Sequence, residues 1–267
     1  PLIVFSLLFE NSNKITKWSK NLPTAKKNNN YLNFIASHDG IGMRPIEGIL
    51  DDNTKKKFFQ RLKKNGGEFS FRKVLGKGKN VYEANITLFN AFKKSNIDKN
   101  GKFGFERFFA AHSIMLSYEG IPAIYFNSIF GNSNDNSKYI ISGNKRDLNR
   151  YRWNSLKLEN HLKDKKSKQN KYYVNMTNLL KIRNNQKAFH PNAKRITMDL
   201  GSNVFAIRRI SLDKMQIITC ITNVTSNIQL LDLNNKVMNG KNLLNEELVK
   251  KNKKLELKPF QTVWISN

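Results

Sequence analysis

Two clusters of polar residues follow apolar runs that are typical of buried β-strands. The first cluster is Ser37-His38-Asp39-Gly40, and the second contains Asn127 and a polar segment that ends at Asp135. In a (β/α) barrel, the side chains that perform chemistry stand at the carboxyl ends of the strands. A carboxylate such as Asp39 can accept hydrogen bonds from sugar hydroxyls and stabilise an oxocarbenium-like transition state, and His38 can donate to the same hydroxyls.

These features also have plainer interpretations. Asp before Gly is common in turns, so capping of the next turn is the other role open to Asp39. The string from Asp98 to Glu106 is similar to a calcium loop, but its Gly is fourth and its Glu ninth, whereas an EF-hand needs them at the sixth and twelfth positions. We therefore expect a turn there, with no metal and no cofactor. The single cysteine, Cys220, lies in an apolar run and is expected to be a buried thiol.

The elements that must position the polar clusters alternate between helices and strands. Helical spacing of apolar residues is found at 1–22, 82–94, 103–118 and about 170–188. Short apolar runs at 31–37 and 122–126 favour buried strands. Residues 41–80 show no clear periodicity, and we expect an irregular insertion there. This alternation is the rhythm of a (β/α) barrel of which only two strands are visible.

The pattern changes after Pro191, where β-rich runs replace helical spacing. These runs lie at 203–210, 215–222, 228–233 and 260–265. The sequence therefore predicts an α/β fold: the C-terminal part of a (β/α)8 TIM barrel over residues 1–190, followed by a small antiparallel β domain over residues 191–267.

The segment 33–48, NFIASHDGIGMRPIEG, closely resembles the seventh-strand motif of the sucrose phosphorylase-like enzymes. These enzymes belong to the α-amylase group, glycoside hydrolase family thirteen. Further segments are similar to that family in the expected order, and they lie at 81–87, 120–126, 145–150, 183–191 and 257–265. The resemblance covers nearly the whole chain, and its most specific part is the His-Asp-Gly-Ile-Gly-x-Arg-Pro string.

The resemblance implies glucosyl transfer with retention of configuration. In this family an Asp attacks the anomeric carbon, a Glu protonates the leaving oxygen, and phosphate takes the glucosyl group as α-glucose 1-phosphate. A third carboxylate holds the 2- and 3-hydroxyls of the sugar; Asp39 matches this transition-state stabiliser, and His38 matches its hydroxyl-binding neighbour. The other substrate-binding candidates are Arg44, Glu83, Asn85, Asp135 and Arg183. For Arg183, an ordinary arginine on a helix surface is the other interpretation.

The family's nucleophile and general acid/base belong to the fourth and fifth barrel strands, which would precede Pro1. Nothing in the chain matches them, and Glu10 is not a substitute, so we expect the chain alone to be inactive. Its expected partners are an α-glucoside, inorganic phosphate and the missing N-terminal half of the enzyme. The string at 44–48 is more like relatives acting on phosphorylated sucrose, glucosylglycerate or glucosylglycerol, which leaves the acceptor open. A non-catalytic sugar-binding remnant is the second hypothesis.

The charge of the chain raises a third hypothesis. Lys and Arg number 47 against 20 Asp and Glu, a net charge of +27 that is typical of nucleic-acid binding. Lys and Asn are enriched together along the chain, however, as at 26–30 and 250–254, which favours a compositional bias, and we expect no specific nucleic-acid partner. The apolar run at the start is too short to span a bilayer and has no basic leader. We expect no membrane contact and a cytoplasmic location.

Overall fold

The computed structural model describes residues 1–26, 28–74, 78–232, 239–250 and 254–267. Parts of four segments discussed above lie outside the described residues. These parts are residue 27 of the run at 26–30, residues 75–77 of the 41–80 segment, residue 233 of the predicted strand at 228–233, and residues 251–253 of the run at 250–254. The chain divides into two compact units. Unit 1 comprises 1–5, 34–108 and 124–177, and unit 2 comprises 6–33, 109–123 and 178–267.

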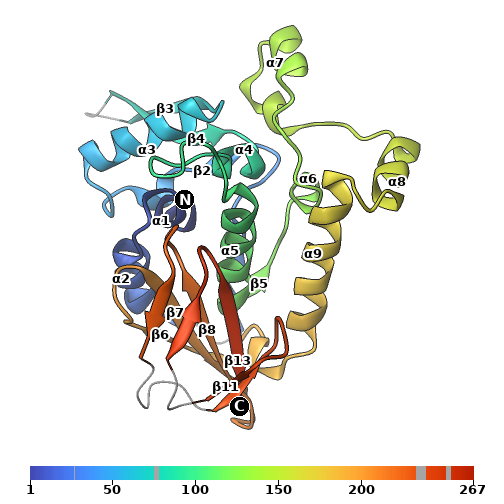
Figure 1. The fold of residues 1–267 in the computed structure, drawn as a ribbon. Helices are drawn as coiled ribbons and strands as arrows, with labels where there is room; N and C mark the ends of the chain where they lie inside the picture. The colour runs from blue at the N-terminus through green and yellow to red at the C-terminus, as the bar shows by residue number, and fades with distance from the viewer. Residues whose placement is uncertain (27, 75–77, 233–238, 251–253) are drawn as a thin grey trace. The chain divides into compact units, whose positions relative to one another are not determined.

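Unit 1 contains most of the short helices and one three-stranded sheet, of order β2-β4-β3 (Figure 1). Its strands are β2 (Ile41–Gly42), β3 (Glu68–Val74) and β4 (Gly78–Asn85). Its helices are η1 (Arg44–Ile46), α3 (Asp52–Lys64), α4 (Leu88–Phe92), α6 (Phe126–Ile129), α7 (Asn136–Ser142), η2 (Lys145–Asn149) and α8 (Ser155–Lys163). Three helices contribute residues to both units: α1 (Leu2–Phe9), α5 (Gly104–Ser117) and α9 (Lys168–Asn184).

The expectation that 41–80 is irregular is wrong, because this segment contains α3, β3 and the start of β4, which pairs with β3 in antiparallel fashion. Asp51 caps α3 by accepting a hydrogen bond of 2.8 Å from the Thr54 amide. Phe58 and Leu62, four residues apart, are the buried residues of the helix. The apolar stripe is thin and surrounded by lysines, and that is why the helical period is weak in the sequence.

The helix predicted at 82–94 is wrong in its first half, because residues 82–85 belong to β4 and only α4 is helical. Pairing of β4 with β3 over Glu68–Val74 supplies long-range hydrogen bonds that override the local spacing. The Thr87 hydroxyl accepts from the Asn90 amide and starts the helix there.

The string similar to a calcium loop has a structural role in unit 1. The carboxylate of Asp98 accepts hydrogen bonds of 2.9 Å from the amides of Lys102 and Phe103, at the turn before α5. It also pairs with Arg107 on α5 at 2.9 Å, and the two side chains are 6% and 0% exposed. Asp98 therefore joins a turn to a buried helix face.

Unit 2 is built on a six-stranded antiparallel sheet of order β11-β10-β13-β8-β7-β6 (Figure 1). The predicted strands at 203–210, 215–222 and 260–265 are confirmed as β7 (Val204–Ile210), β8 (Ile217–Asn223) and β13 (Thr262–Ser266). The run at 228–233 contains β9 (Gln229–Leu231), which pairs with β12 (Leu255–Leu257) in a separate sheet. The other strands are β6 (Lys194–Met198), β10 (Gly240–Asn242) and β11 (Leu248–Val249).

The core of unit 2 combines apolar side chains of the central strands β7, β8 and β13 with Leu257 of β12: Val204, Ala206, Ile221, Leu257, Val263 and Ile265. Cys220 on β8 is buried as expected, and burial raises the pKa of its thiol. The helices predicted at 103–118 and 170–188 are α5 and α9, the latter followed by η3 (Lys187–Phe189). Among the described residues, every helix is too short or too polar to cross a membrane.

The two predicted barrel strands are present but much shorter than expected. Only β1 (Leu32–Asn33) and β5 (Ile121–Pro122) form, and they pair in parallel in unit 2. The expectation that the runs at 31–37 and 122–126 are buried is only partly confirmed, since Ile35 and Ala36 are buried but Leu32 is 63% and Phe126 54% exposed. The cause is topological: in the described residues this sheet has two strands, so neither is flanked on both sides as in a closed barrel.

The single helix predicted at 1–22 is also wrong, because α1 and α2 (Asn13–Asn21) are separate. Glu10 lies between them with a positive φ of 53°, which an α-helix does not allow. Its carboxylate accepts hydrogen bonds of 2.9 Å from the amide and hydroxyl of Ser226 in unit 2.

Candidate functional site

Asp39 stands on a tight turn in unit 1 whose shape depends on a glycine. Ser37 and Gly40 exchange backbone hydrogen bonds of 2.9 and 3.1 Å, and the Ser37 hydroxyl accepts from the Asp39 amide. Gly40 has a φ of +122°, and a Cβ there would lie 2.1 Å from the carbonyl oxygen of Ala84 on β4. The turn can therefore approach β4 only because position 40 carries no side chain.

We predict that Gly40→Ala destabilises the chain by about 1–3 kcal/mol, because the added methyl group must displace the backbone of the turn or of β4. Urea unfolding followed by circular dichroism measures the change. Gly143→Ala is a matched control, since it also has a positive φ but open space around its Cβ. Equal losses in the two variants would show that conformational strain alone, and not the approach to β4, requires glycine at position 40.

The backbone of Asp39 is fixed by two side-chain amides. Asn85 on β4 and Asn149 on η2 both donate to its carbonyl oxygen, at 2.9 and 3.2 Å. Asn85 is fully buried and also donates to the carboxylate of Glu83 at 2.9 Å. Three segments that are remote in sequence therefore meet at Asp39.

The carboxylate of Asp39 is bound on one oxygen only. Arg150 donates to Oδ1 at 2.6 Å, and the Arg146 Nε and His38 Nε2 atoms lie 3.5 and 3.3 Å from the same oxygen. Oδ2 accepts no hydrogen bond from the described residues, and the side chain is 25% exposed. Since Ser37 supplies the turn's side-chain acceptor, the carboxylate of Asp39 is left available to an external donor.

A second carboxylate, that of Glu83, is tied to the first by arginine. The side chain of Glu83 is 8% exposed and lies 3.2 Å from the Arg146 Nε atom. Arg146 also donates to the Tyr82 hydroxyl at 3.0 Å. The hydrogen bond and the charge of Glu83 raise the pKa of Arg146 above its ordinary value. Arg146 thus stays cationic between two carboxylates and holds both in place.

A tyrosine and an asparagine complete the surroundings of His38. The rings of His38 and Tyr125 are 6.4 Å apart, and the Tyr125 hydroxyl donates to the Asn149 carbonyl at 2.8 Å. Asn127 donates to the Tyr125 hydroxyl at 3.0 Å. Burial raises the pKa of the Tyr125 phenol, which therefore remains a neutral donor. Together these side chains form a polar site with two carboxylates, two arginines and an exposed imidazole, suited to a polyhydroxylated ligand.

Comparisons with known proteins relate the sequence of the chain to a group of glucoside phosphorylases. No family model matches the chain. Over 265 residues, 99% of its length, the chain is 32% identical to glucosylglycerate phosphorylase of Allomeiothermus silvanus and 29% identical to that of Escherichia coli. It covers 45% and 46% of those proteins, so it spans about half the length of the curated relatives it matches.

The chain is related to the sucrose phosphorylase-like enzymes of the α-amylase group. Its fold is similar to the crystal structure of sucrose 6F-phosphate phosphorylase from Thermoanaerobacter thermosaccharolyticum, with a TM-score of 0.68 and 17% identity. The similarity covers 96% of this chain and 46% of that one. The resemblance inferred from the sequence motifs is thus confirmed, and the fold of the chain corresponds to part of a (β/α)8 barrel with additional antiparallel sheets.

Four of the seven predicted site residues contact one another in unit 1: His38, Asp39, Glu83 and Asn85. Arg44 lies on η1, is exposed and contributes to the lowered pKa of Glu47, after the larger effect of Arg72. Asp135 caps α7 by accepting from the Lys138 amide at 3.0 Å. Neither Arg44 nor Asp135 is bonded to the Asp39 cluster among the described residues.

Arg183 belongs to unit 2 and is not on the helix surface, since it is 8% exposed. Its guanidinium donates to the carbonyl oxygens of Leu116 and Phe189 at 3.0 and 3.1 Å. Burial lowers its pKa. These bonds tie the ends of α5 and η3 together and give Arg183 a structural role within its unit.

Arg146, Arg150 and Tyr125 belong to the site but were not predicted from the sequence. All three stand in segments that carry the family resemblance, 120–126 and 145–150, but the resemblance assigned no role to them. Their position in the sequence could have indicated a role. Arg146 and Arg150 lie on either side of Asp147 and Asn149, in a loop that follows a predicted barrel strand, where the side chains of barrel active sites are found.

Proposed function

We propose that this chain is the C-terminal part of a retaining phosphorylase, which transfers a glucosyl group from an α-glucoside to inorganic phosphate. The observation that supports this proposal is the state of Asp39: one carboxylate oxygen is held by Arg150, and the other accepts no bond from the described residues. A carboxylate held in this way is preorganised for hydroxyl donors and for a developing positive charge.

In the proposed mechanism, Asp39 Oδ2 accepts hydrogen bonds from the 2- and 3-hydroxyls of the glucosyl ring, and His38 binds a neighbouring hydroxyl. An upstream Asp forms a bond to the anomeric carbon while an upstream Glu gives its proton to the leaving oxygen. A phosphate oxygen then attacks the same carbon and releases the upstream Asp, which yields α-glucose 1-phosphate. Asp39 does not react; it stabilises the positive charge at the ring in both steps.

Glu83 and Asn85 are proposed to shape the side of the site that receives the acceptor or phosphate. Both lie at the end of β4, and Arg146 balances the charge of Glu83. Arg44, Asp135 and Arg183 stay weaker candidates, because the described contacts of Asp135 and Arg183 are structural. Glucosylglycerate, named in the two relatives above, is the first donor to test; sucrose and sucrose phosphate are the next.

We also propose the finer division of the chain. Residues 1–190 would form the C-terminal half of the (β/α)8 barrel, with 41–80 as an inserted α3–hairpin segment, and residues 191–267 the β domain. The parallel pairing of β1 with β5, in which Leu32 is opposite Ile121 and Asn33 opposite Pro122, supports neighbouring barrel strands.

The direct test compares the 267-residue chain with a chimera. In the chimera, the chain replaces the matching part of the Escherichia coli relative and so regains an upstream half. We expect the chain alone to release no glucose 1-phosphate from glucosylglycerate and phosphate, because it has no residue matching the nucleophile or the general acid. We expect the chimera to release it. Turnover by the chain alone would contradict the assignment of the nucleophile and the general acid to the upstream half. A folded but inactive chimera would contradict the proposed function.

A sugar-binding remnant is the second candidate function. The observation in its favour is that His38, Asp39, Glu83, Asn85, Arg146 and Arg150 are held together by contacts within this chain alone. A chain that binds glucose, while the folded chimera has no activity, would favour this candidate.

A further inference from the structure

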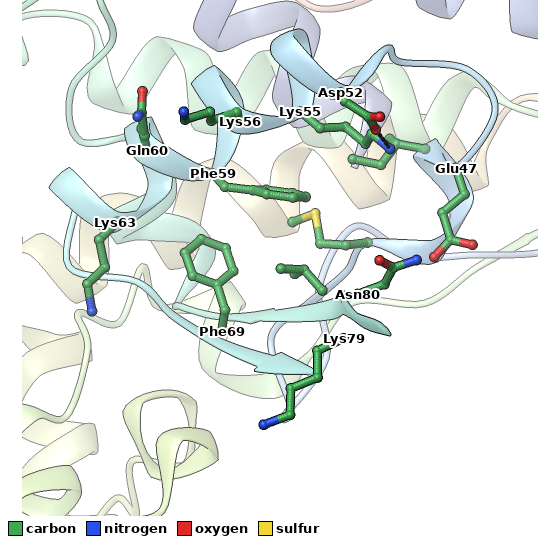
Figure 2. Close-up of a pocket in the computed structure, with 13 residues that line it drawn as sticks. Glu47, Asp52, Lys55, Lys56, Phe59, Gln60, Lys63, Phe69, Lys79 and Asn80 are labelled. Carbon is green, nitrogen blue, oxygen red and sulfur yellow. Dashed lines mark ion pairs between the residues drawn. The ribbon is translucent and has the colours of Figure 1, made fainter. Parts of the chain in front are cut away.

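A cavity lies in unit 1 between α3 and the β3–β4 hairpin, and we call it the hairpin cavity (Figure 2). It has a volume of about 510 Å³, within the range of small-molecule sites. Its lining shares no residue with the Asp39 cluster. The lining residues are Met43, Ile46, Glu47, Asp52, Lys55, Lys56, Phe59, Gln60, Lys63, Phe69, Lys79, Asn80 and Val81.

The floor of the hairpin cavity is apolar. Phe59 from α3 and Phe69 from β3 have ring centroids 5.4 Å apart, and Figure 2 shows the two rings facing the same space from opposite walls. Met43 and Ile46, which also line the cavity, are almost completely buried. Aromatic rings that stay partly accessible in a hollow of this size offer a face to a flat or chain-like apolar group.

The rim is cationic, and its charge is only partly balanced. Three pairs bring a rim residue together with an opposite charge: Lys55 with Asp52 at 2.6 Å, Arg72 with Glu47 at 2.8 Å, and Lys63 with Glu68. Lys56 on α3 and Lys79 on β4 form no ion pair with the described residues. In the hairpin register Lys79 is also opposite Lys73, a like-charge pair that disfavours the strand pairing. An anion at the rim would relieve that repulsion.

We propose that the hairpin cavity binds a small organic anion with an apolar body. The apolar part packs on Phe59 and Phe69, and the carboxylate or phosphate group meets Lys56 or Lys79. Figure 2 shows these two lysines on opposite sides of the cavity with their ammonium groups turned away from it, so the long flexible stem of the lysine that binds must turn over the rim. The rings and the lysines together indicate an amphiphilic anion. A neutral apolar ligand would make no ion pair with the lysines, and inorganic phosphate would make no contact with the aromatic rings.

The test is an NMR titration of the full chain labelled at the methionine methyl groups. The chain has 6 methionines, and Met43 is the one in the cavity lining, so its methyl signal, assigned with Met43→Leu, locates binding. The probe is 4-phenylbutyrate. We expect the Met43 signal to shift with a dissociation constant on the order of 1 mM, since about twelve heavy atoms support no more.

Matched variants separate this cavity from the general positive charge of the chain. The double variant K56Q/K79Q should weaken binding about fivefold, because each partly exposed charge pair contributes a factor of about two to three. K57Q/K64Q removes the same charge from exposed lysines of α3 that do not line the cavity, and should weaken it less than about twofold.

Two further probes each carry only one of the two properties, the apolar body or the charge. The dissociation constants of the neutral 4-phenyl-1-butanol and of inorganic phosphate, measured from the Met43 signal, should each be at least about fivefold higher than that of 4-phenylbutyrate. The proposal is overturned if 4-phenylbutyrate leaves Met43 unshifted, if both double variants weaken binding equally, or if phosphate alone binds as well as the amphiphilic anion.

Discussion

The chimeric phosphorylase carrying Asp39→Asn will lose on the order of 10²–10³-fold in kcat/KM relative to the chimera with Asp39, a loss comparable to removal of one preorganised charge-stabilising group. Asparagine keeps the size of the side chain, but it removes the negative charge that we propose faces the glucosyl ring. It also replaces the charged acceptor of Arg150, which now lies 2.6 Å away, with a neutral amide. The rate of glucose 1-phosphate release from glucosylglycerate and phosphate measures the effect.

The division of this loss between kcat and KM tests the role given to Asp39. An interaction made mainly in the transition state lowers kcat and kcat/KM together, whereas uniform sugar binding raises KM alone. We expect the larger part in kcat. Asp199→Asn is the control, because it is the same substitution at a residue that forms an exposed ion pair with Lys20 in unit 2. A chimera that stays folded and keeps its kcat after Asp39→Asn would exclude Asp39 as the transition-state stabiliser.

The elements that the sequence predicted well have a regular apolar period over several turns or strand positions. For α5, apolar residues recur at helical spacing from Phe105 to Leu116, and the helix follows within one residue at each end. For β7, β8 and β13, runs of β-branched and aromatic residues coincide with strands buried along most of their length. In these elements local preference and tertiary packing favour the same structure.

The errors occurred where tertiary pairing decides the structure. The stretch that becomes the end of β4 has helical spacing, but it pairs with β3 in a register that no local pattern displays. Conversely, two segments were predicted as longer strands than the structure contains: the apolar runs at 31–37 and 122–126 have the pattern of complete barrel strands. Only β1 and β5 form, because barrel strands depend on neighbours on both sides.

The sequence predicted only those residues of the candidate site that belong to a recognisable motif. His38 and Asp39 were found because they end an apolar run and match a specific string. Arg150, which makes the shortest bond to Asp39, lies 111 residues away in sequence. No periodicity connects residues that far apart, so the pair became visible only when η2 and the Asp39 turn were placed together.

The largest effect on stability that we expect comes from the buried pair in unit 1. Asp98→Ala should lower the free energy of unfolding by about 3–5 kcal/mol, the usual result of leaving one member of a buried ion pair without its counter-charge. The variant removes the acceptor of two backbone amides and the carboxylate next to Arg107, whose side chain is 0% exposed. Urea unfolding measures the change.

Two comparisons separate the buried charge from the general loss of a carboxylate. Asp199→Ala removes the acidic member of an exposed pair with Lys20, and should change stability by no more than about 0.5 kcal/mol. Adding Arg107→Met to Asp98→Ala removes the stranded charge as well, and should restore part of the loss. If the double variant is less stable than Asp98→Ala alone, the hydrogen bonds of Arg107 to the carbonyl of Phe92 outweigh its charge.

The pH dependence of the same pair has a definite sign. Burial alone would raise the pKa of Asp98, but hydrogen bonds from the Phe103 and Lys102 amides, together with Arg107, hold that pKa below its ordinary value. A carboxyl with a depressed pKa in the folded chain adds stability above its unfolded pKa of about 4, and that stability is lost as the pH falls through the folded value. The stability difference between the unmodified chain and Asp98→Asn should therefore be constant near neutral pH and shrink below about pH 4. A difference that stayed constant down to about pH 2 would mean that Asp98 stabilises the turn through its shape and not through its charge.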